Sequence, residues 1–194
     1  IVTLRQNANS HYIEIMETRL LRDCSATIIP QGTVITLEKD TPAFVTQTLG
    51  GNATIRIGQT LYRVSSVDVD ALEGLDLGDS VSPAPIVLEG GFSEDSVWEA
   101  LKQCFDPEIP VNIVDLGLIY DMRIVDLKSG KKEISIKMTL TAQGCGMGPT
   151  IAQDAKNRIE QLDEVENADV QIVWEPVWSP QMISEIGRKV LGLE

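Results

Sequence analysis

A run rich in glycine, proline and aspartate between Glu73 and Gly91 constrains the fold most, because it separates two halves with different hydrophobic patterns. This stretch has no periodic apolar face, and its composition is typical of a linker. With 194 residues, the chain is long enough for two small domains. We place the boundary near residues 80 to 90 and expect a β-rich domain over 1–85 and a second domain over 91–194.

The first half consists of short apolar segments, spaced about ten residues apart and separated by turn residues. Gly58-Gln59 joins the segments 53–57 and 60–64 and begins with glycine, as a two-residue hairpin connection often does. The pattern predicts a small β-barrel or roll. Residues 1–23 are less informative, and the stretch 12–16 fits either a strand or a helical turn.

The second half predicts the element order α-β-β-α-β-α, a small mixed sheet with helices on it in an α+β fold. Ser93 is suited to cap a first helix, which we expect to continue until Asp106-Pro107 ends it. A strand over 118–125 is followed by a strictly alternating segment. That alternation buries one set of residues and leaves the other on the solvent face: Ile134, Ile136, Met138 and Leu140 against Glu133, Ser135, Lys137, Thr139 and Thr141.

Three more elements complete the second half. A helix begins near Pro149, which suits the first helical turn. A third strand runs through Val170, Ile172 and Trp174. A last helix begins at Ser179-Pro180, and the pattern places one group of residues on its apolar side: Met182, Ile183, Ile186, Val190 and Leu191.

Charge and cysteine content exclude several classes of function. The net charge of −13 argues against general nucleic-acid binding and against an anionic membrane surface, because both need clustered Lys and Arg. No apolar run approaches the roughly 20 residues of a membrane-spanning helix. Three widely spaced cysteines do not suit a disulfide framework, and we expect a reducing, cytoplasmic environment.

Cys145 is the leading candidate for chemistry. It lies between a strand end and a helix start, in a loop whose glycines, Gly144, Gly146 and Gly148, let a ligand approach the backbone closely. A helix N-terminus stabilises a thiolate, which is the form that acts as nucleophile or metal ligand. The alternative is a buried packing residue, the usual fate of a free cysteine. The residues alone leave both open.

Three carboxylates lie in the loop before the strand at 118: Asp106, Glu108 and Asp115. They can face Cys145 as hard ligands or proton acceptors. Alternatively, Asp106 and Asp115 form Asx-type bonds in turns, which we favour, and Glu108 is solvated.

Trp174, Pro176 and Trp178 form either a partner surface or a cover for the end of the sheet.

The remaining candidates are weaker. Cys104 falls on the apolar stripe of the first helix and is expected in the core, and Cys24 has no thiol neighbour in sequence. His11 is the single histidine, so neither a zinc site nor a cysteine–histidine pair is expected.

Three segments of the second half together resemble a known family. The segment from Asp106 to Tyr120, Met138-Thr-Leu-Thr141 with Cys145, and Trp174-Glu-Pro-Val-Trp178 are together similar to the domain shared by PaaD and the SufT-type factors of Fe–S assembly. The first half also resembles SufT, more loosely, in segments such as Gln47-Thr-Leu-Gly-Gly51. The loop at Cys145 is richer in glycine than the Cys-Pro form of PaaD-like members.

The resemblance implies an accessory factor in Fe–S protein maturation rather than an enzyme, working with the Suf machinery or with client apo-proteins. It implies Cys145 as the reactive or metal-ligating thiol. It also implies a loop motif of Asp106, Pro107, Glu108, Pro110, Asp115, Gly117 and Leu118.

We expect no stably bound cofactor, any iron or cluster being transient, and a homodimer is one route to complete a ligand shell. Two alternatives are a cysteine-nucleophile hydrolase or transferase, and a structural adaptor with Cys145 as a packing residue.

Overall fold

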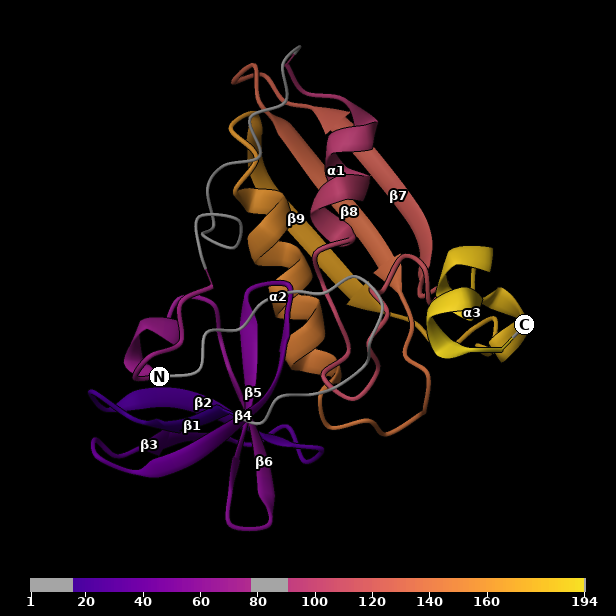
Figure 1. Ribbon diagram of the computed structural model, residues 1–194. Helices are drawn as coiled ribbons and strands as arrows, with labels where there is room; N and C mark the ends of the chain where they lie inside the picture. Colours follow the sequence, from indigo (N-terminus) through magenta and orange to yellow (C-terminus); the bar gives the residue numbers. More distant parts are fainter. Residues whose placement is uncertain (1–15, 78–90, 194) are drawn as a thin grey trace. The chain divides into compact units, whose positions relative to one another are not determined.

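The computed structural model describes residues 16–77 and 91–193. The chain divides into two compact units, residues 1–82 and 83–194 (Figure 1). The boundary expected near residues 80 to 90 lies outside the described residues, as do His11 and nearly all of the ambiguous stretch at 12–16.

The first unit is one six-stranded antiparallel sheet in the order β1-β4-β5-β6-β2-β3. The strands are β1 (Met16–Arg19), β2 (Cys24–Ile29), β3 (Val34–Leu37), β4 (Pro42–Leu49), β5 (Asn52–Ile57) and β6 (Thr60–Val64). The expected barrel is wrong, because β1 and β3 are the two edges of this sheet and do not pair with each other in the described part of the chain. Closure requires ladder bonds between the edge strands, which the strand pattern in the sequence does not encode.

The hairpin and the core of this unit follow from the sequence pattern. Gly58 takes the positive φ of 60° that the tight connection needs, and Ile57 pairs with Thr60 across it. Ala53, Ile55 and Val64 are at 0% exposure, and all four residues from Asn52 to Ile55 are buried. A short 3-10 helix, η1 (Val69–Ala71), then brings Leu72 to a bridge with Leu20.

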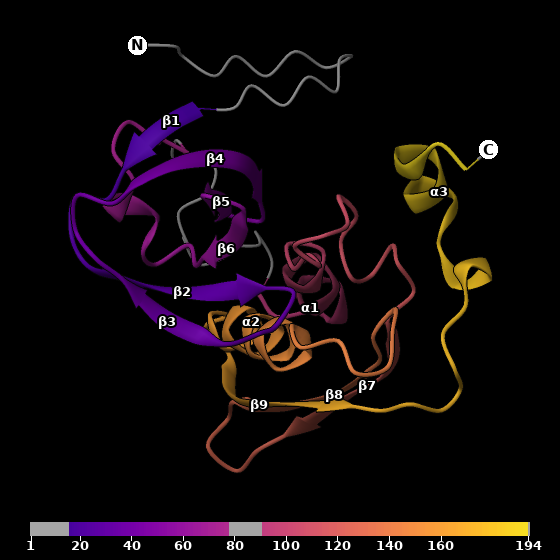
Figure 2. The same ribbon diagram turned by 90° about the horizontal axis from the view of Figure 1, so that it is seen from below.

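The second unit is a three-stranded mixed sheet with helices. Its elements are α1 (Glu94–Leu101), β7 (Ile119–Asp126), β8 (Lys132–Met138), α2 (Gly148–Glu160), β9 (Val165–Ile172), the 3-10 helix η2 (Pro180–Met182) and α3 (Glu185–Leu191). Strand β8 lies in the middle, antiparallel to β7 and parallel to β9. Helices α1 and α2 lie together on one face of the sheet (Figure 2). The chain thus has the α+β class expected.

The alternation in β8 is confirmed within the strand. Ile134, Ile136 and Met138 are all buried beneath the helices, whereas Lys137 is exposed. Helix α2 covers this face with Ile151, Ala155 and Ile159. The capping residue of α1 is also as expected, since the Ser93 hydroxyl accepts a hydrogen bond from the Ser96 amide at 3.3 Å.

The first helix is shorter than expected. It ends at Leu101, and the Cys104 amide donates to the Leu101 carbonyl in a turn. The next residue, Phe105, forms a bridge with Asn112. This non-local pairing takes the chain out of the helix before Asp106-Pro107, although the apolar spacing continues through Phe105.

The single last helix is also wrong, because η2 and α3 are separate. Ser184 caps α3 by accepting a hydrogen bond from the Gly187 amide at 3.0 Å, so the helix restarts with a new phase. Gly187 then faces inward, while Ile186 and Val190 are 65% and 43% exposed. The third strand similarly stops at Ile172, before Trp174. None of the helices within residues 16–77 and 91–193 is long and apolar enough to span a bilayer.

Candidate functional site

Cys145 lies in the turn that enters α2. Its amide donates to the Ala142 carbonyl at 3.4 Å, and its carbonyl accepts from the amide of Gly148, the first residue of the helix, at 3.2 Å. The side chain is partly exposed, whereas Cys24 and Cys104 are buried. The expected position, in a loop directly before a helix N-terminus, is therefore the observed one.

The glycines around Cys145 have different structural reasons. Gly144 has a φ of 81° and open space around it, so it is the backbone conformation of the turn, rather than packing, that favours glycine here. Gly148 is buried, and a Cβ there would lie 2.5 Å from Leu140 Cδ1. Together with Met147, which is fully buried, Gly148 fixes the far end of the loop against the core. Cys145 is thus held between an open turn and a tightly packed helix start.

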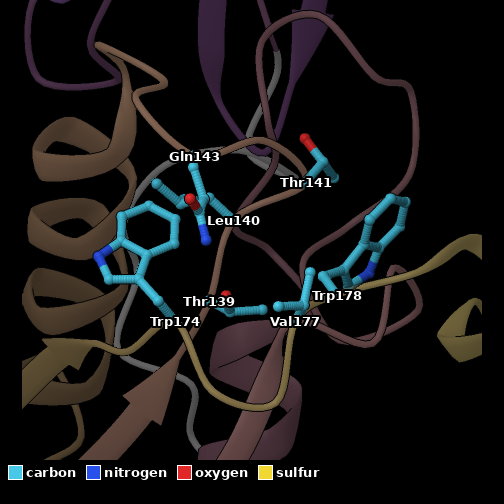
Figure 3. Close-up of a pocket in the computed structure, with 7 residues that line it drawn as sticks. All are labelled: Thr139, Leu140, Thr141, Gln143, Trp174, Val177 and Trp178. Carbon is cyan, nitrogen blue, oxygen red and sulfur yellow. The ribbon is translucent and has the colours of Figure 1, made fainter.

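A small pocket opens beside this loop (Figure 3). Its volume is about 30 Å³, and it is lined by residues of two chain segments: Thr139, Leu140, Thr141 and Gln143 from the loop, and Trp174, Val177 and Trp178 from the chain after β9. The two indoles stand on opposite sides of it in Figure 3. The tryptophans proposed as a partner surface therefore share a pocket with the Cys145 loop.

The segment after β9, residues 173–184, is fastened to the rest of the unit by several hydrogen bonds, and we call it the C-terminal strap. The Val173 amide donates to the Met138 carbonyl at 2.8 Å, and Trp178 Nε1 donates to the Leu116 carbonyl at 2.8 Å. Tyr120 donates its hydroxyl proton to the Pro176 carbonyl at 2.9 Å. These contacts hold Trp178 in place on the pocket wall.

Asp115 connects the loop motif to this strap. Its carboxylate accepts from the Asn112 amide group at 2.7 Å and from the Ser184 hydroxyl at 2.6 Å, and its carbonyl accepts from the Ser184 amide. Gly117 has a φ of 70°, and a Cβ there would collide with the Met182 carbonyl. Asp115 and Gly117 thus hold the strap. The Asx-type bonds expected of Asp115 are made instead by Asn112, whose Oδ1 accepts from the amides of Val114 and Asp115.

The other loop-motif residues divide by burial. Asp106 is buried and accepts a hydrogen bond from the Glu108 amide at 3.0 Å, the Asx-type bond expected of it. Burial raises the pKa of the Asp106 carboxyl, and the bond from Glu108 partly offsets this. Glu108 itself is exposed. Pro107 and Leu118 are buried and Pro110 is exposed, so these three contribute to packing and chain direction.

No metal centre is preformed in the described residues, which contain no group of three or more Cys, His, Asp or Glu side chains placed to hold an ion. Cys104 is fully buried, as expected, and its thiol donates to the Ala100 carbonyl at 3.8 Å. Cys24 is buried in the core of the first unit, where burial raises the pKa of its thiol. Cys145 is the one thiol of the three that a partner can reach.

Sequence reasoning missed part of the pocket. Alternation placed Thr139 on the solvent face, but it is 1% exposed, because β8 ends at Met138 and the chain after β9 returns over this position. Gln143 and Val177 were also not singled out. Their only signal in the sequence is proximity, since Gln143 lies two residues before Cys145 and Val177 lies between the two tryptophan positions.

The second half of the chain is similar to known proteins. Residues 94–172, which include the loop motif and Cys145, match the family described as iron-sulfur cluster assembly protein. The Fe-S protein maturation auxiliary factor YitW of Bacillus subtilis is 38% identical over 102 residues, which are 52% of this chain and 95% of that protein. This chain belongs to the iron-sulfur cluster assembly protein family.

The chain is also similar to a second curated protein and to a solved structure. The Fe-S protein maturation auxiliary factor SufT of Staphylococcus aureus is 36% identical over 45% of this chain and 96% of its own length. A crystal structure of a domain of unknown function, DUF59, from Bacillus anthracis is 33% identical, covers 52% of this chain and 92% of that chain, and has a TM-score of 0.45. The two curated relatives match about half of this chain along nearly all of their own length.

Proposed function

We propose that this chain is a non-enzymatic accessory factor in the maturation of Fe–S proteins and that Cys145 is its working thiol. The observation that carries the proposal is the placement of Cys145. It is the partly exposed cysteine, it lies in a glycine-lined turn at the start of α2, and it falls within the segment that matches the family. Relatives of this chain carry the name of auxiliary maturation factors.

A single thiol sets the chemistry. Protein-bound Fe–S clusters usually need four ligands, most often cysteine thiolates, and carboxylate oxygens suit them poorly. Cys104 and Cys24 are buried, and the described residues hold no further ligand group. Cys145 therefore handles iron, sulfur or a cluster transiently, with the remaining ligands supplied by the Suf machinery or by a client apo-protein. A homodimer that joins two Cys145 loops is the second route to a complete shell.

The competing reading is a cysteine-nucleophile enzyme. Such an enzyme needs a base within hydrogen-bonding reach of the thiol. Within residues 16–77 and 91–193, no side chain forms a hydrogen bond with Cys145 Sγ. The absence of such a bond favours the accessory role over the enzyme. We propose that the protein acts in the cytoplasm, where cysteines stay reduced.

Anaerobic reconstitution with iron and sulfide tests the proposal. We expect the purified protein to be colourless and to gain less than one iron per chain, and we expect Cys145→Ser to abolish that gain. Optical absorption and iron analysis measure both. A stable brown cluster at one per chain that persists in Cys145→Ser would contradict the proposal.

Alkylation separates a working thiol from a packing residue. Iodoacetamide at neutral pH, followed by peptide mass spectrometry, should modify Cys145 much faster than Cys104 in the same sample. Cys104 is the internal control, because it is fully buried. Equal slow rates at both positions would favour the structural adaptor.

A further inference from the structure

The pocket beside Cys145 contains an unused hydrogen-bonding group at its base. Thr139 is 1% exposed as a whole residue, and it lines the pocket; its hydroxyl forms no hydrogen bond with the residues that the structure describes, but it is not among the fully buried atoms without a partner. The side chain lies on the pocket wall between Trp174 and Val177 (Figure 3). Because no described residue bonds to this hydroxyl, it is available to a group that enters the pocket, and a hydrogen bond to it adds to the affinity.

The lining specifies the chemistry of what can enter. It contains two hydroxyls, one amide, two indoles, a leucine and a valine, and no Asp, Glu, Lys, Arg or His. A charged group would therefore lose water without gaining a counter-charge. A volume of about 30 Å³ admits only a few heavy atoms, since a cavity needs at least about 10 to 15 Å³ to hold a single water.

The rim of the pocket indicates that the entering group belongs to a polypeptide. Val177 is 68% exposed and Trp174 is 39% exposed, so apolar surface continues outward from the pocket. A free small molecule would leave this surface uncovered, whereas a chain running past the pocket covers it. Tryptophan is enriched at such contact sites, and Trp178 is held in place by its bond to the Leu116 carbonyl.

We propose that this pocket binds one small, uncharged side chain with a hydrogen-bonding end, of the size of Ser, Thr or Cys, from a client polypeptide. The inference rests on the proposed function, which supplies a client. Thr139 and Gln143 bond to the end of that side chain, and the indoles enclose its carbon atoms. Because Gln143 is two residues from Cys145, the bound client segment lies close to the working thiol.

Titration of the full, ¹⁵N-labelled chain with capped peptides tests this under reducing conditions. The peptides are Gly-Gly-X-Gly-Gly, with X as Ser, Thr, Cys, Ala, Asp or Lys. The Ser, Thr and Cys peptides should shift the indole N–H signals of Trp174 and Trp178 and bind several-fold more tightly than the others. The indole of Trp98, which donates to Glu94 in α1, is the internal reference and should not move.

Variants locate the binding. Thr139→Val keeps the size and removes the hydroxyl, and it should weaken the Ser peptide about fivefold to tenfold. Gln143→Leu, at an exposed position where folding is not at risk, should weaken it in the same direction. Thr150→Val, outside the pocket lining, is the matched control and should leave the affinity unchanged.

Two results would overturn the inference: no shift at Trp174 and Trp178 with any peptide, as for a pocket that holds only water, or equal affinity for the Asp, Lys and Ser peptides. Cys145→Ser separates this failure from that of the proposed function. The Ser peptide should still bind to Cys145→Ser, because the pocket does not contain the thiol. If peptide binding needs Cys145 but not Thr139, the inference that the pocket binds the side chain is wrong, and the proposed function of Cys145 is unaffected.

Discussion

Two polar regions of this molecule, one in each unit, differ in how their side chains are satisfied. In the first unit, Arg19 pairs with Glu73, and Arg22 pairs with Asp68 and Asp70, so the chain between β1 and β2 is joined to the segment around η1. In the second unit, Thr139, Thr141 and Gln143 have no side-chain hydrogen bond to any described residue. The first region uses its polar groups to close the fold, and the second leaves them available.

We infer from this difference that the first region is structural and that the second is available to bind a partner. Polar side chains that bond within the chain contribute to the folded state and have little left to offer a partner. Unused polar groups beside a partly exposed thiol keep their capacity for a ligand.

The loop around Cys145 depends on strand β8, so damage to the buried face of β8 should remove the site altogether. Ile136→Asp places an unpaired charge at a position that is 1% exposed, and we expect a loss of several kcal/mol, enough to unfold the second unit. Ser135→Asp, on the opposite face of the same strand, is the control. Thermal unfolding measured by circular dichroism would contradict the assignment of the faces if both variants kept the wild-type Tm.

The strap that forms the second wall of the pocket depends on Gly117. Gly117 has a positive φ, and an alanine there would drive its Cβ into the Met182 carbonyl. We therefore expect Gly117→Ala to lower the free energy of unfolding by about 3 kcal/mol. Gly130 has a similar φ but open space around it, so Gly130→Ala should lower the free energy of unfolding by about 1 kcal/mol. Denaturant unfolding measures both. Equal losses would show that the strap does not pack tightly on Gly117.

Asp106 gives the second unit a pH-dependent component of stability. Because burial raises its pKa in the folded state above the ordinary 3.8, its contribution to stability is greatest below about pH 4 and decreases as pH rises through the folded-state pKa. We expect Asp106→Asn to be more stable than wild type at pH 7 and equal to it near pH 3. The exposed Glu108→Gln is the control and should change stability little at either pH. A variant less stable than wild type at pH 7 would show that the charged form is the favoured one.

The ion pairs of the first unit should have the smallest effect. Arg22 is exposed, and surface pairs are weakened by salt. We expect Arg22→Gln to lower the Tm slightly at low salt and not at all in about 1 M salt. The same variant should leave alkylation of Cys145 unchanged. A large, salt-independent loss would contradict the assignment of these pairs as weak, solvent-exposed interactions.

Local signals were enough to predict the parts of the molecule that local interactions determine. Ser93 caps α1, Gly58 makes the hairpin, and Cys145 lies at the start of α2, each within a few residues of the partner that requires it. The α+β class and membership of the Fe–S assembly family also followed from the sequence and its resemblance.

The errors come from contacts between segments far apart in the chain. Thr139 was expected on the solvent face, but the chain after β9 returns over it. Ile186 and Val190 were expected in the core, but Ser184 restarts the helix and turns Gly187 inward instead. The open edges of the first sheet likewise depend on which strands meet. Periodicity reports the faces of one element, not what later covers them.

The central claim is that Cys145 is the working thiol of a maturation factor, and cells lacking the native gene test it most directly. The measurement is the activity of Fe–S enzymes after complementation with wild type, Cys145→Ser or the control Ser135→Ala, at matched protein levels. We predict that wild type and Ser135→Ala restore activity and that Cys145→Ser does not, although its Tm is unchanged. Full restoration by Cys145→Ser would contradict the account.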